Sequence, residues 1–169
     1  MPRLAALLAA VLLLAGCATV QRYDAAQDVH ALLVAIRDND RATFDRHVDR
    51  RALKRQLEAR LIDEAQGSGA PGLLQGLGIT LVEPVAELAG ELLIQPRVFR
   101  WVAESYGYRR TDPLPSPMAI SPALRPIGGG RVCATTKSGG PCVLVFARSE
   151  GVWKLSGFEG DISMLRARR

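Results

Sequence analysis

The chain has 169 residues, a formal net charge of +5 and 23% charged residues. This length and composition are typical of a single globular domain. Its basic residues are almost all arginine, with lysine only at positions 54, 137 and 154. They do not alternate with aromatic residues as in single-strand nucleic-acid binders, and the basic excess is modest. We therefore expect no nucleic-acid partner.

The N-terminus is typical of a secretory signal. Arg3 supplies a positive start, and residues 4–14 are an unbroken run of Leu, Ala and Val, too short for a stable membrane span. The following Leu14-Ala15-Gly16-Cys17 resembles the lipobox of bacterial lipoproteins, whose cysteine thiol is diacylated before cleavage. The resemblance implies that residues 1–16 are a lipoprotein signal peptide and that Cys17 is the lipidated N-terminus. The alternative is an ordinary signal peptide cut near Cys17.

The signal peptide and the lipobox together imply membrane attachment in the bacterial cell envelope through an N-terminal lipid. Residues 17–22 are interpreted as the lipidated tether. Ala18, rather than Asp, follows the cysteine, and under the sorting rule of enteric bacteria this implies the outer membrane, facing the periplasm. Inner-membrane anchoring stays open. An envelope protein or a glycan is the further partner expected in that compartment.

Residues 23–160 are predicted to form a single domain with a helical part at 24–105. We expect Asp24 to cap the first helix, with Tyr23 packing over its start, and Asn39 to end it. Asp40 and Asp49 are each predicted to cap a further helix. The apolar residues at helical spacing are Val29, Leu32, Leu33 and Ile36, then Phe44 and Val48, and then Leu53, Leu57, Leu61 and Ala65.

Residues 67–72 are predicted to be a flexible joint, followed by an apolar helix at 73–94. Glu83, Glu87 and Glu91 lie four residues apart, and such an acidic stripe argues against a membrane span. The stripe is either a solvated face or, through Glu83 and Glu87, the lining of a pocket.

Pro96 is predicted to begin another helix that continues to Ser105. Its inward residues are expected to be Val98, Phe99 and Val102. Trp101 is assigned to the core. An aromatic surface for a partner, formed by Trp101 with Tyr106 and Tyr108, is the alternative.

The C-terminal part is predicted to be a β-meander at 131–158, reached through an extended Pro- and Gly-rich connection at 107–130 and followed by a basic tail at 161–169. Three strands are expected, at 131–136, 142–148 and 152–158. A two-residue turn at Glu150-Gly151 pairs Arg148 with Trp153 and Phe146 with Leu155. That register places Leu144, Phe146, Trp153 and Leu155 against the helices, and Val145, Lys154 and Ser156 on the other face. The expected fold class is α+β, with helices on one face of a small antiparallel sheet.

Cys133 and Cys142 flank a turn signal at Ser138-Gly139-Gly140-Pro141. If the loop spans most of this segment, the two thiols face each other and can form a disulfide outside the cytoplasm. A tight turn at Gly139-Gly140 would instead pair Cys142 with Lys137 and separate the sulfur atoms. Both registers stay open.

The sequence shows no catalytic constellation. His30 and His47 are 17 residues apart without partners at zinc-site spacing, and both are assigned to exposed helix positions. Nucleophile elbows and phosphate-binding glycine loops are absent from the sequence. We predict no catalytic residue, no metal and no cofactor.

The residues Tyr23, Ala35-Ile36, Asp40, Val48-Asp49, Leu53-Lys54, Leu57, Phe146-Ala147-Arg148 and Gly151-Val152-Trp153-Lys154-Leu155 resemble a bacterial family known only as a domain of unknown function. The resemblance implies a short secreted or membrane-anchored protein and brings no activity. Helices followed by such a meander also resemble the cystatin and nuclear-transport-factor cones, in which a helix packs in a curved sheet. The favoured hypothesis is a non-enzymatic binding or assembly accessory. The alternative is a small-ligand carrier or enzyme with a pocket between helices and sheet.

Overall fold

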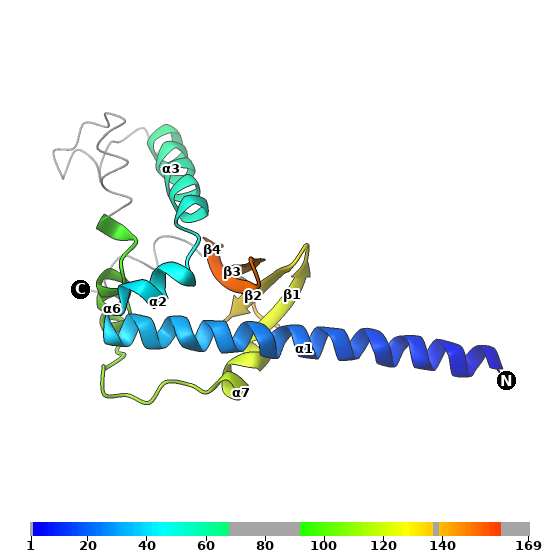
Figure 1. The fold of residues 1–169 in the computed structure, drawn as a ribbon. Coiled ribbons are helices and arrows are strands. Elements are labelled where there is room, and N and C mark those ends of the chain that lie inside the picture. The colour runs from blue at the N-terminus through cyan, green and yellow to red at the C-terminus, as the bar shows by residue number, and fades with distance from the viewer. Residues whose placement is uncertain (1, 68–91, 137–138, 160–169) are drawn as a thin grey trace.

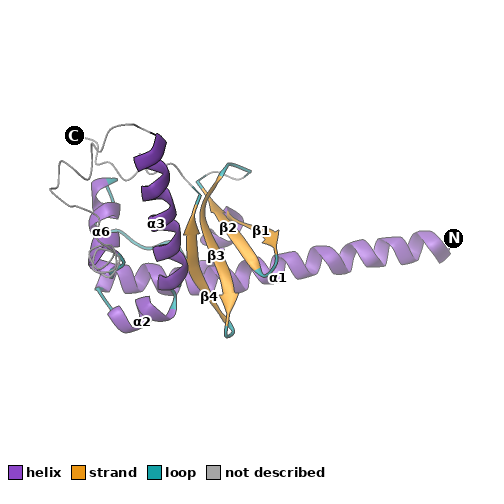
Figure 2. Cartoon of the chain, turned by 90° about the horizontal axis from the view of Figure 1, so that it is seen from above, coloured by secondary structure: helices purple, strands orange, loops and turns teal. Residues whose placement is uncertain are grey.

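The computed structural model describes residues 2–67, 92–136 and 139–159. It has the predicted α+β arrangement, with helices first and an antiparallel sheet of four strands in the order β1-β2-β3-β4 (Figures 1 and 2). The helices are α1 (Pro2–Asp38), α2 (Arg41–Arg46), α3 (Arg50–Gly67), α6 (Pro96–Ser105) and α7 (Pro117–Ile120), with a 3-10 turn at Ser121–Ala123. The strands are β1 (Leu124–Gly128), β2 (Arg131–Thr135), β3 (Cys142–Ser149) and β4 (Val152–Phe158).

The first helix is longer than expected. The prediction that it starts at Asp24 is wrong, because α1 runs without a break from Pro2 to Asp38. No Gly or Pro separates Cys17 from Asp24, so nothing there interrupts the helix. Tyr23 is consequently 42% exposed on the helix surface rather than packed over a helix start. The predicted end is confirmed, since Asn39 follows the helix with φ of 58°.

The two predicted aspartate caps are confirmed. The backbone N–H of Thr43 donates to Asp40 Oδ1 at 3.1 Å, and that of Ala52 donates to Asp49 Oδ1 at 2.9 Å. Pro96 is also the first residue of α6, as expected. The two aspartate caps begin α2, which lies alongside α1, and α3, which lies alongside β4 (Figure 2).

The connection at 107–130 is more structured than predicted. It contains α7 and β1, and it buries Ile120 and Leu124 in the core. The side chain of Ser116 accepts a hydrogen bond from the Ala119 N–H, and Pro117 occupies the first turn of α7. A proline within a strand is tolerated in β1 because β1 is an edge strand. Prolines therefore occur here at the start of a helix and in an edge strand, two positions where they are compatible with regular secondary structure.

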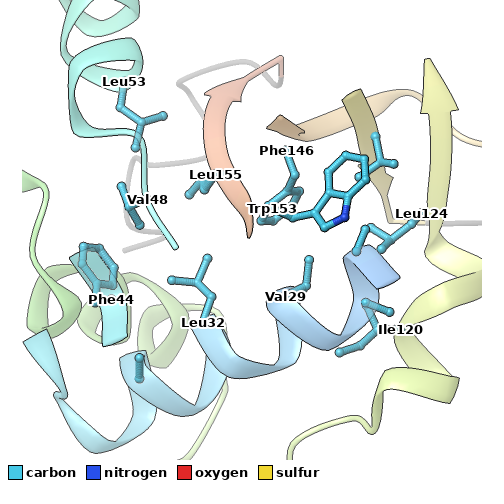
Figure 3. Packing of buried hydrophobic residues seen from close by; sticks show 14 of the residues in the cluster. Val29, Leu32, Phe44, Val48, Leu53, Ile120, Leu124, Phe146, Trp153 and Leu155 are labelled. Atoms are coloured by element: carbon cyan, nitrogen blue, oxygen red, sulfur yellow. The ribbon is translucent and has the colours of Figure 1, made fainter. Parts of the chain in front are cut away.

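The β3–β4 hairpin has the predicted register. Phe146 pairs with Leu155, and Arg148 pairs with Trp153. Figure 3 shows Phe146, Trp153 and Leu155 directed toward α1 and the chain that follows it. Leu144 packs against the same core from a partly buried position. The core of buried residues comprises Ala25, Ala26, Val29, Leu32, Ala35, Phe44, Val48, Leu53, Ile94, Ile120, Leu124, Val132, Phe146, Trp153 and Leu155.

The outer edge of β4 is closed by residues from the helical part. Leu155 donates its N–H to the His47 carbonyl at 2.8 Å and accepts from the Asp49 N–H at 2.9 Å, which forms a parallel bridge to Val48. Further along, the Gln56 side-chain amide donates to the Phe158 carbonyl at 2.6 Å and accepts from the Phe158 N–H at 2.7 Å. An open strand edge can pair with another chain, so these contacts protect β4.

Cys133 and Cys142 form the predicted disulfide, with their Cα atoms 5.5 Å apart. Thr135 pairs with Cys142, and Cys133 pairs with Val145, with a shift of register between Ala134 and Thr135. The tight-turn alternative is therefore wrong, because Cys142 faces Thr135 rather than Lys137. The irregularity brings the two cysteines together diagonally.

Several predictions fall outside the described residues. They are the joint at 68–72, most of the helix predicted at 73–94 with Glu83, Glu87 and Glu91, and the tail at 161–169. The side chains of Leu61 and Ala65 in α3 are likewise not described. Within the described part of the chain, no helix is both long and apolar enough to cross a membrane.

Candidate functional site

A polar cluster joins α1 to the start of β4. Asp24 Oδ2 accepts a hydrogen bond from the Trp153 indole Nε1 at 2.9 Å, and Asp28 Oδ2 accepts from the Trp153 backbone N–H at 2.8 Å. Both carboxylates belong to α1, one turn apart, so they reach the same residue of β4. Asp24 was predicted to cap a helix, and its contact with Trp153 was not predicted. A carboxylate pair four residues apart beside an apolar helix face was the signal that could have found it.

Two basic side chains complete the cluster. His47 Nε2 lies 3.3 Å from Asp28 Oδ1, and Arg148 Nη1 lies 3.3 Å from Asp24 Oδ2. The Arg148 guanidinium also lies over the Trp153 ring, 5.9 Å from the ring centroid. Each carboxylate therefore has a hydrogen-bond donor from Trp153 and a basic neighbour.

Both histidines were predicted to be exposed, and neither is fully so. His47 is only 5% exposed, because its ring lies under α1 and its Nδ1 is 2.8 Å from the Thr43 carbonyl oxygen. His30 is partly buried, with Nδ1 2.9 Å from the carbonyl oxygen of Pro115 in the connection that crosses α1. The prediction was wrong because it considered each helix in isolation, whereas α1 covers His47 and the connection at Pro115 covers His30.

The geometry of the cluster suits a structural role. Asp28 and His47 resemble an acid–base pair, but the histidine ring is covered and both of its nitrogens already face protein oxygen atoms. A general base needs a nitrogen within reach of a substrate proton. Among the described residues, no group of three or more His, Cys, Asp or Glu side chains is placed to hold a metal ion. The cluster therefore fastens the sheet to α1.

The second candidate surface lies on and before α6. Trp101 was predicted to be in the core, and that prediction is wrong, because the residue is 59% exposed. Phe99 takes the inward position instead, with its ring 5.2 Å from that of Phe44. Trp101 follows Phe99 by two positions, and side chains two positions apart on a helix point to nearly opposite sides. Tyr106 is 60% exposed as well, whereas Tyr108 is partly buried.

Two more large apolar residues are exposed just before this helix. Leu92 is 52% exposed and Leu93 is 49% exposed. We call Leu92, Leu93, Trp101 and Tyr106 the α6 surface. Exposed aromatic and aliphatic residues in one region of a fold are typical of contact sites for partners.

The predicted lipidation residue, Cys17, lies within α1, eight residues before the core residue Ala25. The N-terminal part of α1 projects past the sheet, at the opposite end of the fold from α3 and α6 (Figures 1 and 2). The predicted pocket residues Glu83 and Glu87 lie outside the described residues, so the pocket hypothesis stays a prediction.

Together, the fold and these contacts define a small α+β domain of helices locked onto an antiparallel sheet. A family model described as a protein of unknown function, DUF2939, matches residues 8–101. The match covers more than half of the 169 residues, and the chain belongs to this family. No curated protein and no solved structure matches the chain.

The matched segment has a clear structural meaning. It contains α1 from residue 8 onward, α2, α3 and the first part of α6, and it ends before β1. Asp28, His47 and Asp49 lie inside it, whereas Trp153 and Leu155, which they contact, lie beyond it. The family match therefore covers the helical side of the interface with the sheet.

Proposed function

We propose that the protein is a lipid-anchored component of the bacterial cell envelope, attached through Cys17, with its domain facing the periplasm. The observation that carries this proposal is the sequence Leu14-Ala15-Gly16-Cys17 after an apolar run. Outer-membrane attachment is the favoured location, because Ala18 follows the cysteine. Cys17 precedes Ala25, the first residue of the core, by eight residues, so a lipid on Cys17 would not collide with the core, which supports the same proposal.

The Cys133–Cys142 disulfide is independent support. Stable disulfides persist mainly outside the reducing cytoplasm, and a periplasmic domain meets that condition. Cys17 is then the remaining cysteine of three, free for acylation. A leader, a lipidation cysteine and a disulfide-closed domain together fit an exported protein.

The role that fits best is a non-enzymatic binding or assembly accessory. The polar cluster around Trp153 is engaged in holding α1 to β4, whereas the α6 surface presents four large apolar side chains to solvent. This surface lies at the far end of the fold from the projecting helix (Figures 1 and 2). A lipid at Cys17 would therefore direct the α6 surface toward envelope partners, either protein or glycan.

Metabolic labelling with a clickable palmitate analogue tests the anchor. The wild type should be labelled and should fractionate with membranes, while Cys17→Ser should lose the label. A Cys133→Ser/Cys142→Ser double variant is the matched control, because it removes two thiols and should keep the label. Equal labelling of the wild type and the Cys17 variant would refute lipid attachment at Cys17.

A photoreactive phenylalanine in place of Trp101 tests the accessory role. Irradiation of cells should give a discrete adduct with an envelope protein or glycan. The matched control carries the same probe at Arg51, which is exposed on α3. If solubilised membranes repeatedly yield no partner, or if both positions give the same adducts, the binding role is wrong.

A further inference from the structure

The stretch between Asp112 and Glu150 has an unusual charge pattern. Residues 113–149 contain no Asp or Glu, whereas they contain Arg125, Arg131, Lys137 and Arg148. Arg125 lies on β1 and Arg131 at the start of β2, and both are exposed. Among the described residues, neither of these two guanidinium groups forms an ion pair with a carboxylate. The β1–β2 hairpin (residues 124–135) is therefore a basic surface without local neutralisation.

The hairpin lies on the side of the fold from which α1 projects. β1 is the edge strand closest to the projecting part of α1, whereas α3 and α6 are at the other end (Figures 1 and 2). Cys17 precedes the core residue Ala25 by eight residues, which is about 12 Å along a helix. A lipid on Cys17 would thus hold the membrane surface within a short distance of the hairpin.

Apolar side chains occupy the same stretch of α1. Between Cys17 and Ala25, Val20 is 70% exposed and Tyr23 is 42% exposed. An aromatic and an aliphatic side chain within two turns of a lipidated residue suit the headgroup level of a membrane. The hairpin tip consists of Gly128, Gly129 and Gly130, and the Arg131 side chain lies against it, with Nε 3.8 Å from where a Cβ on Gly129 would stand.

We propose that the β1–β2 hairpin, with Val20 and Tyr23 of α1, binds the anionic phospholipid headgroups of the membrane that carries the anchor. This inference rests on the lipid attachment proposed above. The guanidinium groups of Arg125 and Arg131 would donate hydrogen bonds to lipid phosphate oxygens, a geometry that arginine provides well. The domain then lies against the membrane in one orientation, with the α6 surface turned outward.

The test uses the mature lipidated protein, purified from membranes and reconstituted in vesicles. A photoreactive phenylalanine replaces Ile127, a partly buried residue at the register shift of the hairpin. In a second preparation it replaces Tyr23, in case the first substitution disturbs β1. A third carries the probe at Trp101 as the distal control. Phospholipid adducts are counted by mass spectrometry in vesicles of phosphatidylglycerol with phosphatidylcholine and of phosphatidylcholine alone.

We expect adducts at 127 and 23, and background at 101. Each arginine near an anionic surface changes binding about fivefold, so Arg125→Glu/Arg131→Glu should lower the yield at 127 at least fivefold. High salt or phosphatidylcholine alone should have a similar effect. Arg51→Glu/Arg97→Glu, which reverses two exposed charges on α3 and α6, should leave the yield unchanged.

Two outcomes separate this inference from the proposed anchor. If the purified protein carries no acyl chain on Cys17, the anchor proposal fails and the inference falls with it. If the protein is acylated but the yield at 127 and 23 equals that at 101, or does not respond to the arginine pair, the anchor stands and the docking surface is refuted. Adducts in intact cells with a polysaccharide instead of phospholipid would also overturn it.

Discussion

Asp28 of α1 accepts a hydrogen bond from the backbone N–H of Trp153 at 2.8 Å, across a separation of 125 residues. The same carboxylate lies 3.3 Å from His47 Nε2, so it contacts the chain that leads from α2 to α3 as well as β4. One side chain thus connects the helical part to the sheet. Its neighbour Asp24 holds the indole of the same tryptophan.

Asp28→Ala should destabilise the domain by about 1–3 kcal/mol, because it leaves the covered N–H of Trp153 without an acceptor. Asp28→Asn should cost less, since its amide oxygen can still accept from that N–H. The free energy of unfolding from urea denaturation measures both. Gln27→Ala, at an exposed position of α1 next to Asp28, is the control and should change stability by less than about 0.5 kcal/mol. Equal effects of Ala and Asn at position 28 would contradict this role.

The disulfide should contribute roughly 2–3 kcal/mol, as expected for a short closed loop in the chain-entropy model. Unfolding of the wild type with and without a reductant, and of Cys133→Ala/Cys142→Ala, gives this value. Cys17→Ser serves as the control, because Cys17 lies ahead of the core. A double variant as stable as the oxidised wild type would show that the cross-link contributes nothing.

The two tryptophans should differ in how much their substitution destabilises the protein and in how strongly iodide quenches their fluorescence. Trp153 is 1% exposed in the core, so Trp153→Ala should cost about 3–5 kcal/mol. Trp101 is 59% exposed, and Trp101→Ala should cost less than about 0.5 kcal/mol. Iodide should quench the fluorescence of Trp153→Phe, which retains Trp101, far more than that of Trp101→Phe. Similar quenching in both variants would contradict the assignment of Trp101 to the α6 surface.

The Asp40 cap should make the stability of the protein depend on pH in the acidic range. The hydrogen bonds from Thr43 hold the pKa of the Asp40 carboxyl below its ordinary value of 3.8. The unfolded chain therefore takes up this proton first, so the contribution is full above pH 3.8 and is lost as the pH falls through the lower folded pKa. Asp40→Asn keeps a cap that does not titrate. The wild type should lose stability relative to this variant as the pH is lowered below 3.8, and a constant difference would contradict the cap.

Local patterns predicted those parts of the fold that local chemistry determines. The two aspartate caps, Pro96 at the start of α6, the Glu150-Gly151 turn and the disulfide all follow from residues close together in sequence. The register of β3 and β4 followed from the turn alone. It placed Trp153 and Phe146 on the face that packs on the helices.

The errors arose where contacts between distant segments decide the outcome. Asp24 is a good helix cap by type, but the helix continues through it and its carboxylate meets Trp153 instead. His47 is covered because Asp28 of α1 and Leu155 of β4 both lie against it. Trp101 looked like a core residue by size, yet Phe99 already fills that place. None of these partners is visible within a window of a few residues.

The family match includes residues with clear structural roles. Asp40, Asp49 and Leu53 lie within residues 8–101, and the structure assigns them to two caps and the core. These residues define how α2 and α3 follow α1 and close the edge of β4. They belong to the framework of the domain.

The mass of the mature protein tests the central claim most directly. Intact-mass and N-terminal peptide spectrometry of the protein extracted from envelope membranes should show a chain that begins at Cys17 and carries acyl groups on that residue. A chain that begins at Ala18 or elsewhere near it without lipid, or one that retains residues 1–16, would contradict the account of a lipid-anchored envelope protein.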